Sequence, residues 1–198
     1  MTNSAQPPAP SGSTIHPRPM RVLITADQLQ KRVVELAAQI DTDFANETPV
    51  LIGLLKGSFI FLADLCRAVT IPHLVDFMAI AAYGGGTSHS GGVRLLKDLN
   101  VNITGRSAIV IEDIIDSGLT MAYIRRLLLA RQPRRLAIAT LLDKKSRRET
   151  DLPIEYVGFE IGGGFVVGYG LDLAERYRHL PYITELDLTA AEEMPTSE

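Results

Sequence analysis

Hydrophobic and polar positions follow two alternating patterns along the middle of the chain. Mainly apolar runs of strand length cover 20–24, 49–55, 75–83, 107–112, 135–142, 156–160 and 165–168. In the segment after residue 25, apolar residues recur at helical spacing, at Leu29, Val33, Leu36, Ala37 and Ile40. Residues 25–28 have the spacing of a capping box, so the first helix is predicted to begin there. Further helices are predicted from the 56–58 turn to about Ala68, and over about 120–131.

These predicted elements define an α/β fold. Strands that are apolar on both faces and separated by helices are typical of a parallel sheet with right-handed crossovers. Ligands bind such sheets beyond the carboxyl ends of the strands. The predicted place for a site is therefore just after Leu55, Ile111, Leu142 and Val167.

Length and composition indicate one globular domain, predicted over 20–189. Residues 1–19 contain five of the eleven prolines and are predicted to be a disordered tail, as is the acidic segment 190–198. The 20 basic and 23 acidic side chains give a net charge of −3, which argues against a nucleic-acid partner. With one cysteine, no signal pattern and no apolar run of about 18 to 20 residues, we expect a cytoplasmic protein without a membrane partner.

The segment 109–120 carries the most chemical information. An apolar strand ends in the adjacent carboxylates Glu112 and Asp113, and the chain then enters a helix through Asp116, Ser117, Gly118, Leu119 and Thr120. The free N–H groups of a helix start suit a phosphate, and the glycine and two hydroxyls favour its close approach. The carboxylates suit sugar hydroxyls or a divalent cation. An acid pair or a helix cap alone is usually structural, but the whole string favours a ligand site.

This string resembles the phosphoribosyl pyrophosphate (PRPP) motif of the type I phosphoribosyltransferases. Its Glu-Asp-Ile-Ile-Asp-Ser-Gly form is similar to that of the hypoxanthine-guanine phosphoribosyltransferases. The likeness runs from about Val50 to Ile183 and includes Lys56-Gly57-Ser58, Lys97-Asp98-Leu99, Leu142-Asp143-Lys144, Phe165 to Asp172, and Arg178 to Tyr182. The resemblance implies a mostly parallel twisted sheet flanked by helices, a small hood, and a mobile Gly-rich lid that begins at Tyr83.

The resemblance also implies an activity, in which a phosphoribosyl group passes from PRPP to hypoxanthine or guanine with release of pyrophosphate. Asp116 is expected to be the general base, and the amides and hydroxyls of 116–120 to bind the 5′-phosphate. Lys56, Gly57 and Arg178 are expected at the pyrophosphate. Glu112 and Asp113 would hold the ribose hydroxyls, directly or through Mg²⁺, with Asp172 as a further magnesium ligand.

The purine is expected to meet a different group of residues. Lys144 would donate to the exocyclic oxygen of a 6-oxopurine, Phe165 would stack on the ring, and the Val166 backbone, with Asp172 beside it, would contact the far edge. Lys145, Arg147 and Arg148 are expected to be solvated. In the family the Lys56–Gly57 peptide can be cis, which the sequence leaves open.

Two departures from the family pattern leave the ranking of purines open. Ala82 stands where the family usually has serine before the lid tyrosine, and Gly162-Gly163-Gly164 replaces Pro-Asp and a charged residue. A xanthine-preferring enzyme is one alternative. Another is a regulatory protein that binds RNA or DNA through a basic face of Arg125, Arg126, Arg131, Arg134 and Arg135. The family implies a homodimer or homotetramer.

Overall fold

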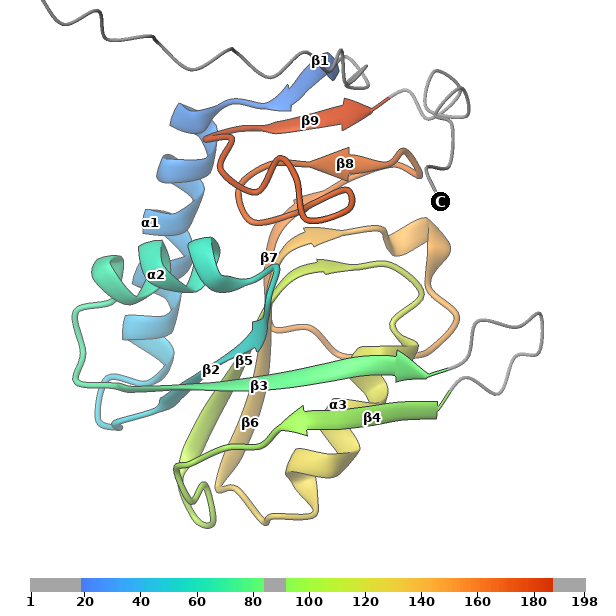
Figure 1. The fold of residues 1–198 in the computed structure, drawn as a ribbon. Helices are drawn as coiled ribbons and strands as arrows, with labels where there is room; N and C mark the ends of the chain where they lie inside the picture. Colours follow the sequence, from blue (N-terminus) through green and yellow to red (C-terminus); the bar gives the residue numbers. More distant parts are fainter. Residues whose placement is uncertain (1–18, 84–91, 187–198) are drawn as a thin grey trace, which may run out of the picture.

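The computed structural model describes residues 19–83 and 92–186 (Figure 1). Its elements are β1 (Pro19–Ile24), α1 (Ala26–Asp43), β2 (Val50–Leu55), α2 (Phe59–Ala68), β3 (Leu74–Tyr83), β4 (Gly92–Lys97), β5 (Ser107–Ile115), α3 (Leu119–Leu129), β6 (Arg135–Asp143), the 3₁₀ turn η1 (Lys145–Arg147), β7 (Tyr156–Glu160), β8 (Val166–Val167) and β9 (Ile183–Leu186). Both predicted tails lie outside the described residues except Pro19, and so does most of the predicted lid. Within the described ranges, no helix has the length and apolar character needed to cross a membrane.

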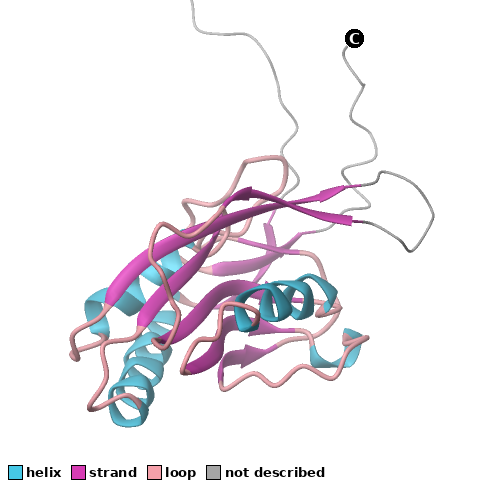
Figure 2. Cartoon of the chain, turned by 90° about the horizontal axis from the view of Figure 1, so that it is seen from below, coloured by secondary structure: helices cyan, strands magenta, loops and turns pink. Residues whose placement is uncertain are grey.

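A six-stranded sheet forms the centre of the molecule, in the order β4-β3-β2-β5-β6-β7. Its strands are parallel except β4, which runs antiparallel to β3. Alternate side chains of β2 and β5 point to opposite faces, where α1 and α2 cover one side and α3 the other (Figures 1 and 2). The predicted α/β fold with a mostly parallel sheet is confirmed.

A second sheet of three antiparallel strands, β1-β9-β8, lies beside the first and forms the hood that the resemblance implied (Figure 1). The prediction that 20–24 and 165–168 belong to the parallel sheet was wrong. Apolar content does not encode strand direction, and Val22 on β1 is 46% exposed rather than buried on both faces. The short strands β4 and β9 were not predicted.

The ends of the elements near the site differ slightly from the predictions. The capping box of Thr25 and Gln28 is present at the start of α1. β5 extends to Ile115 because it continues to pair with β6 as far as Asp143, so Glu112 and Asp113 belong to the strand. α3 begins directly after Gly118, whose φ of 81° is a left-handed conformation that glycine adopts without strain.

Two arginines of the basic face proposed for nucleic acid are engaged within the chain. Arg131 pairs with Asp98 at 2.7 Å. Arg135 lies over the Phe44 ring at 4.2 Å and donates to the Asp43 carbonyl at 3.0 Å. These contacts join the segment after α3 and the start of β6 to neighbouring parts of the chain, so both guanidinium groups have roles in packing.

Candidate active site

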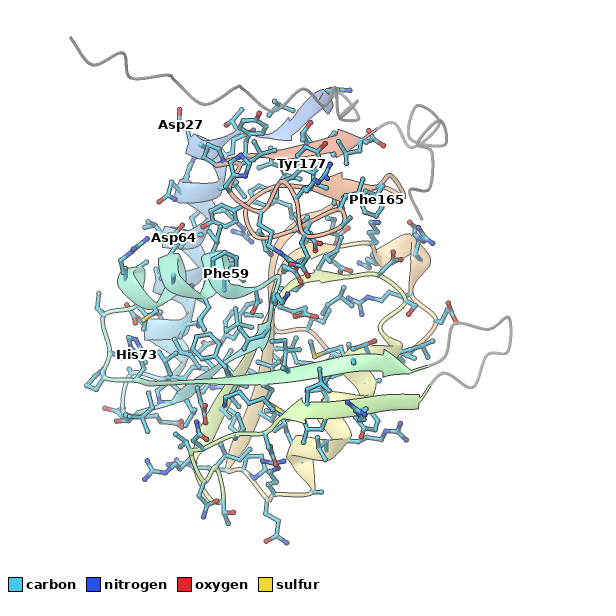
Figure 3. The ribbon with its side chains drawn as sticks, in the orientation of Figure 1. Asp27, Phe59, Asp64, His73, Phe165 and Tyr177 are labelled. Carbon is cyan, nitrogen blue, oxygen red and sulfur yellow. The ribbon has the colours of Figure 1, made fainter. Side chains whose placement is uncertain are left out.

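The carboxyl ends of β5 and β6 border a cleft of about 470 Å³ that is closed on its other side by the hood. The cleft brings together six predicted site residues: Asp113, Asp116, Lys144, Phe165, Val166 and Asp172. Phe165 immediately precedes β8 in the hood (Figure 3). Residues that follow β5 and β6 therefore meet residues of the hood in one cleft.

The Asp116 carboxylate lies between two cations. Lys144 Nζ is 3.4 Å from Oδ2, and Arg147 Nε is 3.0 Å from Oδ1. Lys144 is only 5% exposed, and its backbone N–H donates to the Ile115 carbonyl, which fixes it beside the acidic string. A buried ammonium next to a carboxylate provides a donor and a proton acceptor in one wall of the cleft.

The three basic residues after Lys144 were all predicted to be solvated, but they differ in their surroundings. Lys145 is exposed, but Arg147 also lines the cleft. Arg148 is partly buried and pairs with Asp143 at 2.9 Å. Arg147 is exposed, as predicted, although it also pairs with Asp116. The prediction was wrong for Arg148, whose side chain folds back onto the end of β6, which sequence spacing does not reveal.

A smaller pocket of about 160 Å³ lies over the turn that leads into α3. It is lined mainly by the predicted phosphate-binding string: Glu112, Ile114, Ile115, Asp116, Ser117, Gly118, Thr120 and Met121. The N-terminal amides of α3 lie at this turn, where the helix dipole favours an anion. The smaller pocket and the cleft share Ile114 and Asp116, so they are neighbours.

The adjacent carboxylates Glu112 and Asp113 border different pockets, because successive strand residues point to opposite faces. Burial raises the pKa of Glu112 well above its usual range, and the neighbouring Asp113 charge adds to this. Burial also raises the pKa of Asp113, to about 6, although backbone N–H groups and Arg178 oppose it. A Cβ on Gly57 would overlap the Asp113 carboxylate, so only glycine permits this approach.

The predicted pyrophosphate residues converge on a carboxylate that the prediction missed. Glu175 accepts from Lys56 Nζ at 2.9 Å and from Arg178 Nη2 at 3.2 Å. Arg178 Nη2 also pairs with Asp172 at 2.8 Å. Glu175 therefore occupies the space between two cations that were expected to bind an anionic ligand. No local motif marks it, because it lies 119 residues from Lys56 in the sequence.

The turn after β2 contains a cis peptide bond, but at Leu55–Lys56 rather than at Lys56–Gly57. Ser58 then donates from Oγ to the Leu54 carbonyl at 2.7 Å and is fully buried, which holds the turn against the end of β2. This turn places Lys56 at the edge of the sheet, beside Glu175 of the loop between β8 and β9 (residues 168–182), called the hood loop below.

Comparison with known proteins agrees with this geometry. The sequence model described as the phosphoribosyl transferase domain matches residues 25–174. The chain belongs to the phosphoribosyltransferase family. A hypoxanthine phosphoribosyltransferase of Salmonella typhimurium is 50% identical over 171 residues, which span 85% of this chain and 96% of the relative. A hypoxanthine-guanine phosphoribosyltransferase of Bacillus subtilis is 47% identical over 163 residues, covering 82% and 91% of the two chains.

Solved structures of this phosphoribosyltransferase family share the fold. A crystal structure of a hypoxanthine-guanine phosphoribosyltransferase from Bacillus anthracis, with a HEPES molecule in its active site, has a TM-score of 0.83 and 49% identity. The structural match spans 86% of this chain and 100% of the Bacillus anthracis chain. The resemblance inferred from the 109–120 string is therefore confirmed at the level of family and fold.

Proposed function

We propose that this chain transfers the phosphoribosyl group of PRPP to hypoxanthine or guanine, which yields the nucleotide and pyrophosphate in purine salvage. One observation carries the proposal: the smaller pocket, over the turn into α3, and the cleft share Asp116. If the 5′-phosphate of PRPP fills the smaller pocket, the reacting carbon of its ribose would lie beside Asp116. A purine bound in the cleft could reach that carbon. The family and the relatives named hypoxanthine-guanine phosphoribosyltransferase support the same reaction.

In this reaction a bond forms between a nitrogen of the purine's five-membered ring and C1 of the ribose. The bond from that carbon to the pyrophosphate oxygen breaks, and the oxygen takes the electron pair. The ring nitrogen loses a proton, for which we assign Asp116 as the acceptor. Lys144 and Arg147 hold this carboxylate in position at 3.4 and 3.0 Å.

Selection of a 6-oxopurine falls to Lys144. An ammonium group only donates hydrogen bonds, so it favours the exocyclic oxygen of hypoxanthine or guanine over the amino group of adenine. Phe165 and Val166 line the same cleft and would supply a stacking surface and backbone groups.

The phosphorylated sugar would extend from the smaller pocket toward the hood. The amides and hydroxyls of 116–120 would bind the 5′-phosphate, and Glu112 and Asp113 would hold the ribose hydroxyls. The pyrophosphate would displace Glu175 from Lys56 and Arg178. The Nε of Arg178 is buried without a hydrogen-bond partner in the described part of the chain, which fits a further anionic ligand.

The residues of the cleft fit Mg²⁺ bound jointly by protein and substrate. Asp113 and Asp172 line one cleft, whereas Glu112 lines the other pocket, and residues 19–83 and 92–186 form no cluster of three or more metal-binding side chains. Mg²⁺ commonly uses one or two carboxylates, with water and substrate phosphates completing the octahedron. When bound, it would neutralise charge that develops on the leaving pyrophosphate.

The ranking of purines depends on the departure at 162–164. A Cβ on Gly164 would overlap the Glu185 carboxylate, so the Glu185 side chain occupies space that a larger residue would fill. We propose that this change weakens purine binding or alters the preference among hypoxanthine, guanine and xanthine. Unchanged kcat/KM values for all three purines after Pro-Asp-Lys replaces Gly162-Gly163-Gly164 would contradict it. A homodimer or homotetramer remains the expected assembly.

The test is PRPP-dependent nucleotide formation with Mg²⁺ and each of hypoxanthine, guanine, xanthine and adenine. We expect pyrophosphate release with the 6-oxopurines and at least about 100-fold lower kcat/KM with adenine. Lys144→Gln should reduce this discrimination, whereas the exposed neighbour substitution Lys145→Gln should not. Failure of the purified, folded protein to bind PRPP in calorimetry would overturn the proposal.

A further inference from the structure

The hood loop between β8 and β9 (residues 168–182) begins with an unusual backbone. Gly168, Tyr169 and Gly170 have successive φ angles of 102°, 50° and 104°. Glycine adopts this region freely, but a tyrosine there is strained and must be held by its surroundings. Backbone N–H groups of Tyr169 and Gly170 donate to the carbonyls of Leu180 and Arg178 at 2.8 and 3.0 Å, which closes the loop on itself.

The Tyr169 side chain connects this loop to helix α2. Its ring is 3% exposed, and its hydroxyl donates to the carboxylate of Asp64. Asp64 lies on α2 (Figure 3), and it also accepts from Gln30 at 3.2 Å and pairs with Arg67. Burial, together with the hydrogen bond to Asp64, raises the pKa of Tyr169, so its hydroxyl stays a donor.

Both segments joined by this bond carry residues of the pyrophosphate end. Helix α2 begins just after the turn that contains Lys56, and the hood loop carries Asp172 and Arg178. The two backbones also touch, because a Cβ on Gly170 would overlap the Gly57 carbonyl oxygen. Arg178 Nη1 in turn donates to the Gly170 carbonyl at 2.7 Å. The position of Gly170 therefore affects the distance between Lys56 and Arg178.

We propose that Tyr169 and Asp64 are positioning residues for the pyrophosphate group of PRPP. Their hydrogen bond fixes the hood loop relative to the turn after β2, and thereby sets the spacing of Lys56, Arg178 and Asp172. The inference rests on the proposed function, because it assigns these residues to one end of that substrate. Neither residue touches the reacting atoms.

The bond is suited to this role because it acts at a strained point. Without the hydroxyl contact, Tyr169 could relax toward an ordinary backbone conformation, and Gly170 would move away from Gly57. A displacement of about 1 Å in a positioning group can reduce rate by as much as 100-fold. The purine end of the cleft depends less on this bond. Lys144 and Asp116 directly follow strands β6 and β5 of the central sheet, and Val166 is held by the pairing of β8 with β9.

The first test compares two buried tyrosines that lose only a hydroxyl. Tyr169→Phe should raise the KM for PRPP, and for pyrophosphate in the reverse reaction, roughly five- to tenfold, with the KM for the purine within about twofold. Tyr156→Phe is the matched control. Tyr156 is 2% exposed and donates to Asp43 at 2.6 Å, away from the cleft. Tyr156→Phe should lower Tm about as much as Tyr169→Phe does, but it should leave the KM values for PRPP and for the purine unchanged.

The second test changes the acceptor. Asp64→Asn retains an oxygen that can accept from Tyr169, so the KM for PRPP should stay near that of the unaltered protein. Asp64→Ala should reproduce the effect of Tyr169→Phe, and the double variant should add little to either. An active wild-type chain whose KM for PRPP is the same in Tyr169→Phe as in Tyr156→Phe would overturn the positioning role alone. An inactive wild-type chain would instead contradict the proposed function.

Discussion

The carboxylate of Asp116 is the only acidic group that borders both pockets within the described residues. Asp116→Asn should lower kcat by about two orders of magnitude or more, because an amide cannot accept the proton of the purine ring. The KM for PRPP should change little, since the amides and hydroxyls of 117–120 remain. Steady-state kinetics would measure both. The exposed substitution Asp151→Asn is the control, and unaltered turnover of Asp116→Asn would remove this residue from the base role.

Asp113 illustrates a conflict between stability and function in one side chain. Burial raises its pKa from 3.8 to about 6, so the charged form is disfavoured in the folded protein. Its favourable contribution is therefore present below about pH 4 and is lost as the pH rises through 6. Asp113→Asn should raise the free energy of unfolding at pH 7.5 by up to about 3 kcal/mol, with no gain near pH 4.

Urea denaturation at the two pH values, with a chelator present, would measure this difference. The exposed Asp151→Asn should show no such pH dependence. Activity should fall in Asp113→Asn, because the ribose and its metal would lose a carboxylate. A stability difference between Asp113→Asn and the unaltered chain that is the same at both pH values would show that burial of the charged Asp113 carboxylate does not destabilise the fold.

At the scale of elements, Asp76 joins β3 to the segment after β4. It is 5% exposed and accepts from the backbone N–H groups of Phe77, Asn100 and Val101 at 2.7 to 2.8 Å. Asp76→Ala should lower the free energy of unfolding by about 2 to 4 kcal/mol, since three donors lose their acceptor. Asp98→Ala, which breaks an exposed ion pair, should cost less than about 1 kcal/mol.

The pH dependence of this variant gives a second readout. Burial alone would raise the pKa of Asp76, but the three N–H donors and Lys97 outweigh it and hold the pKa below 3.8. The stabilisation is therefore complete above that value and is lost as the pH falls below it. The stability difference between the unaltered chain and Asp76→Ala should shrink in acid. A constant difference would exclude the carboxylate charge as its source.

The central strands could be predicted because their burial on both faces requires continuous runs of apolar residues, which are visible in the sequence. The runs of β2, β5 and β6 are apolar on both faces, and the phosphate-type string at 112–120 is contiguous. The hood could not be assigned, since β1 and β9 pair from opposite ends of the chain. Likewise Glu175 and the Tyr169–Asp64 bond depend on contacts across more than 100 residues, which no local motif marks.

At the scale of the molecule, the proposed substrates would contact residues of both sheets. β5 and the turns after β5 and β6 contribute Asp113, Asp116 and Lys144, and the hood contributes Phe165 and Asp172. PRPP would reach from the turn at the start of α3 to the loop after β8. A ligand that contacts both sheets should stabilise the hood as well as the fold as a whole.

PRPP with Mg²⁺ at 100 times its Kd should raise the free energy of unfolding by about 2.7 kcal/mol. Hydrogen exchange should slow at the amides of Tyr169 and Gly170, whose hydrogen bonds close the hood loop. Ribose 5-phosphate is the matched control, because it can fill the phosphate pocket without reaching Arg178, and should protect the turn at 116–120 alone. Equal protection of the hood by both ligands would mean that the pyrophosphate does not connect the two sheets.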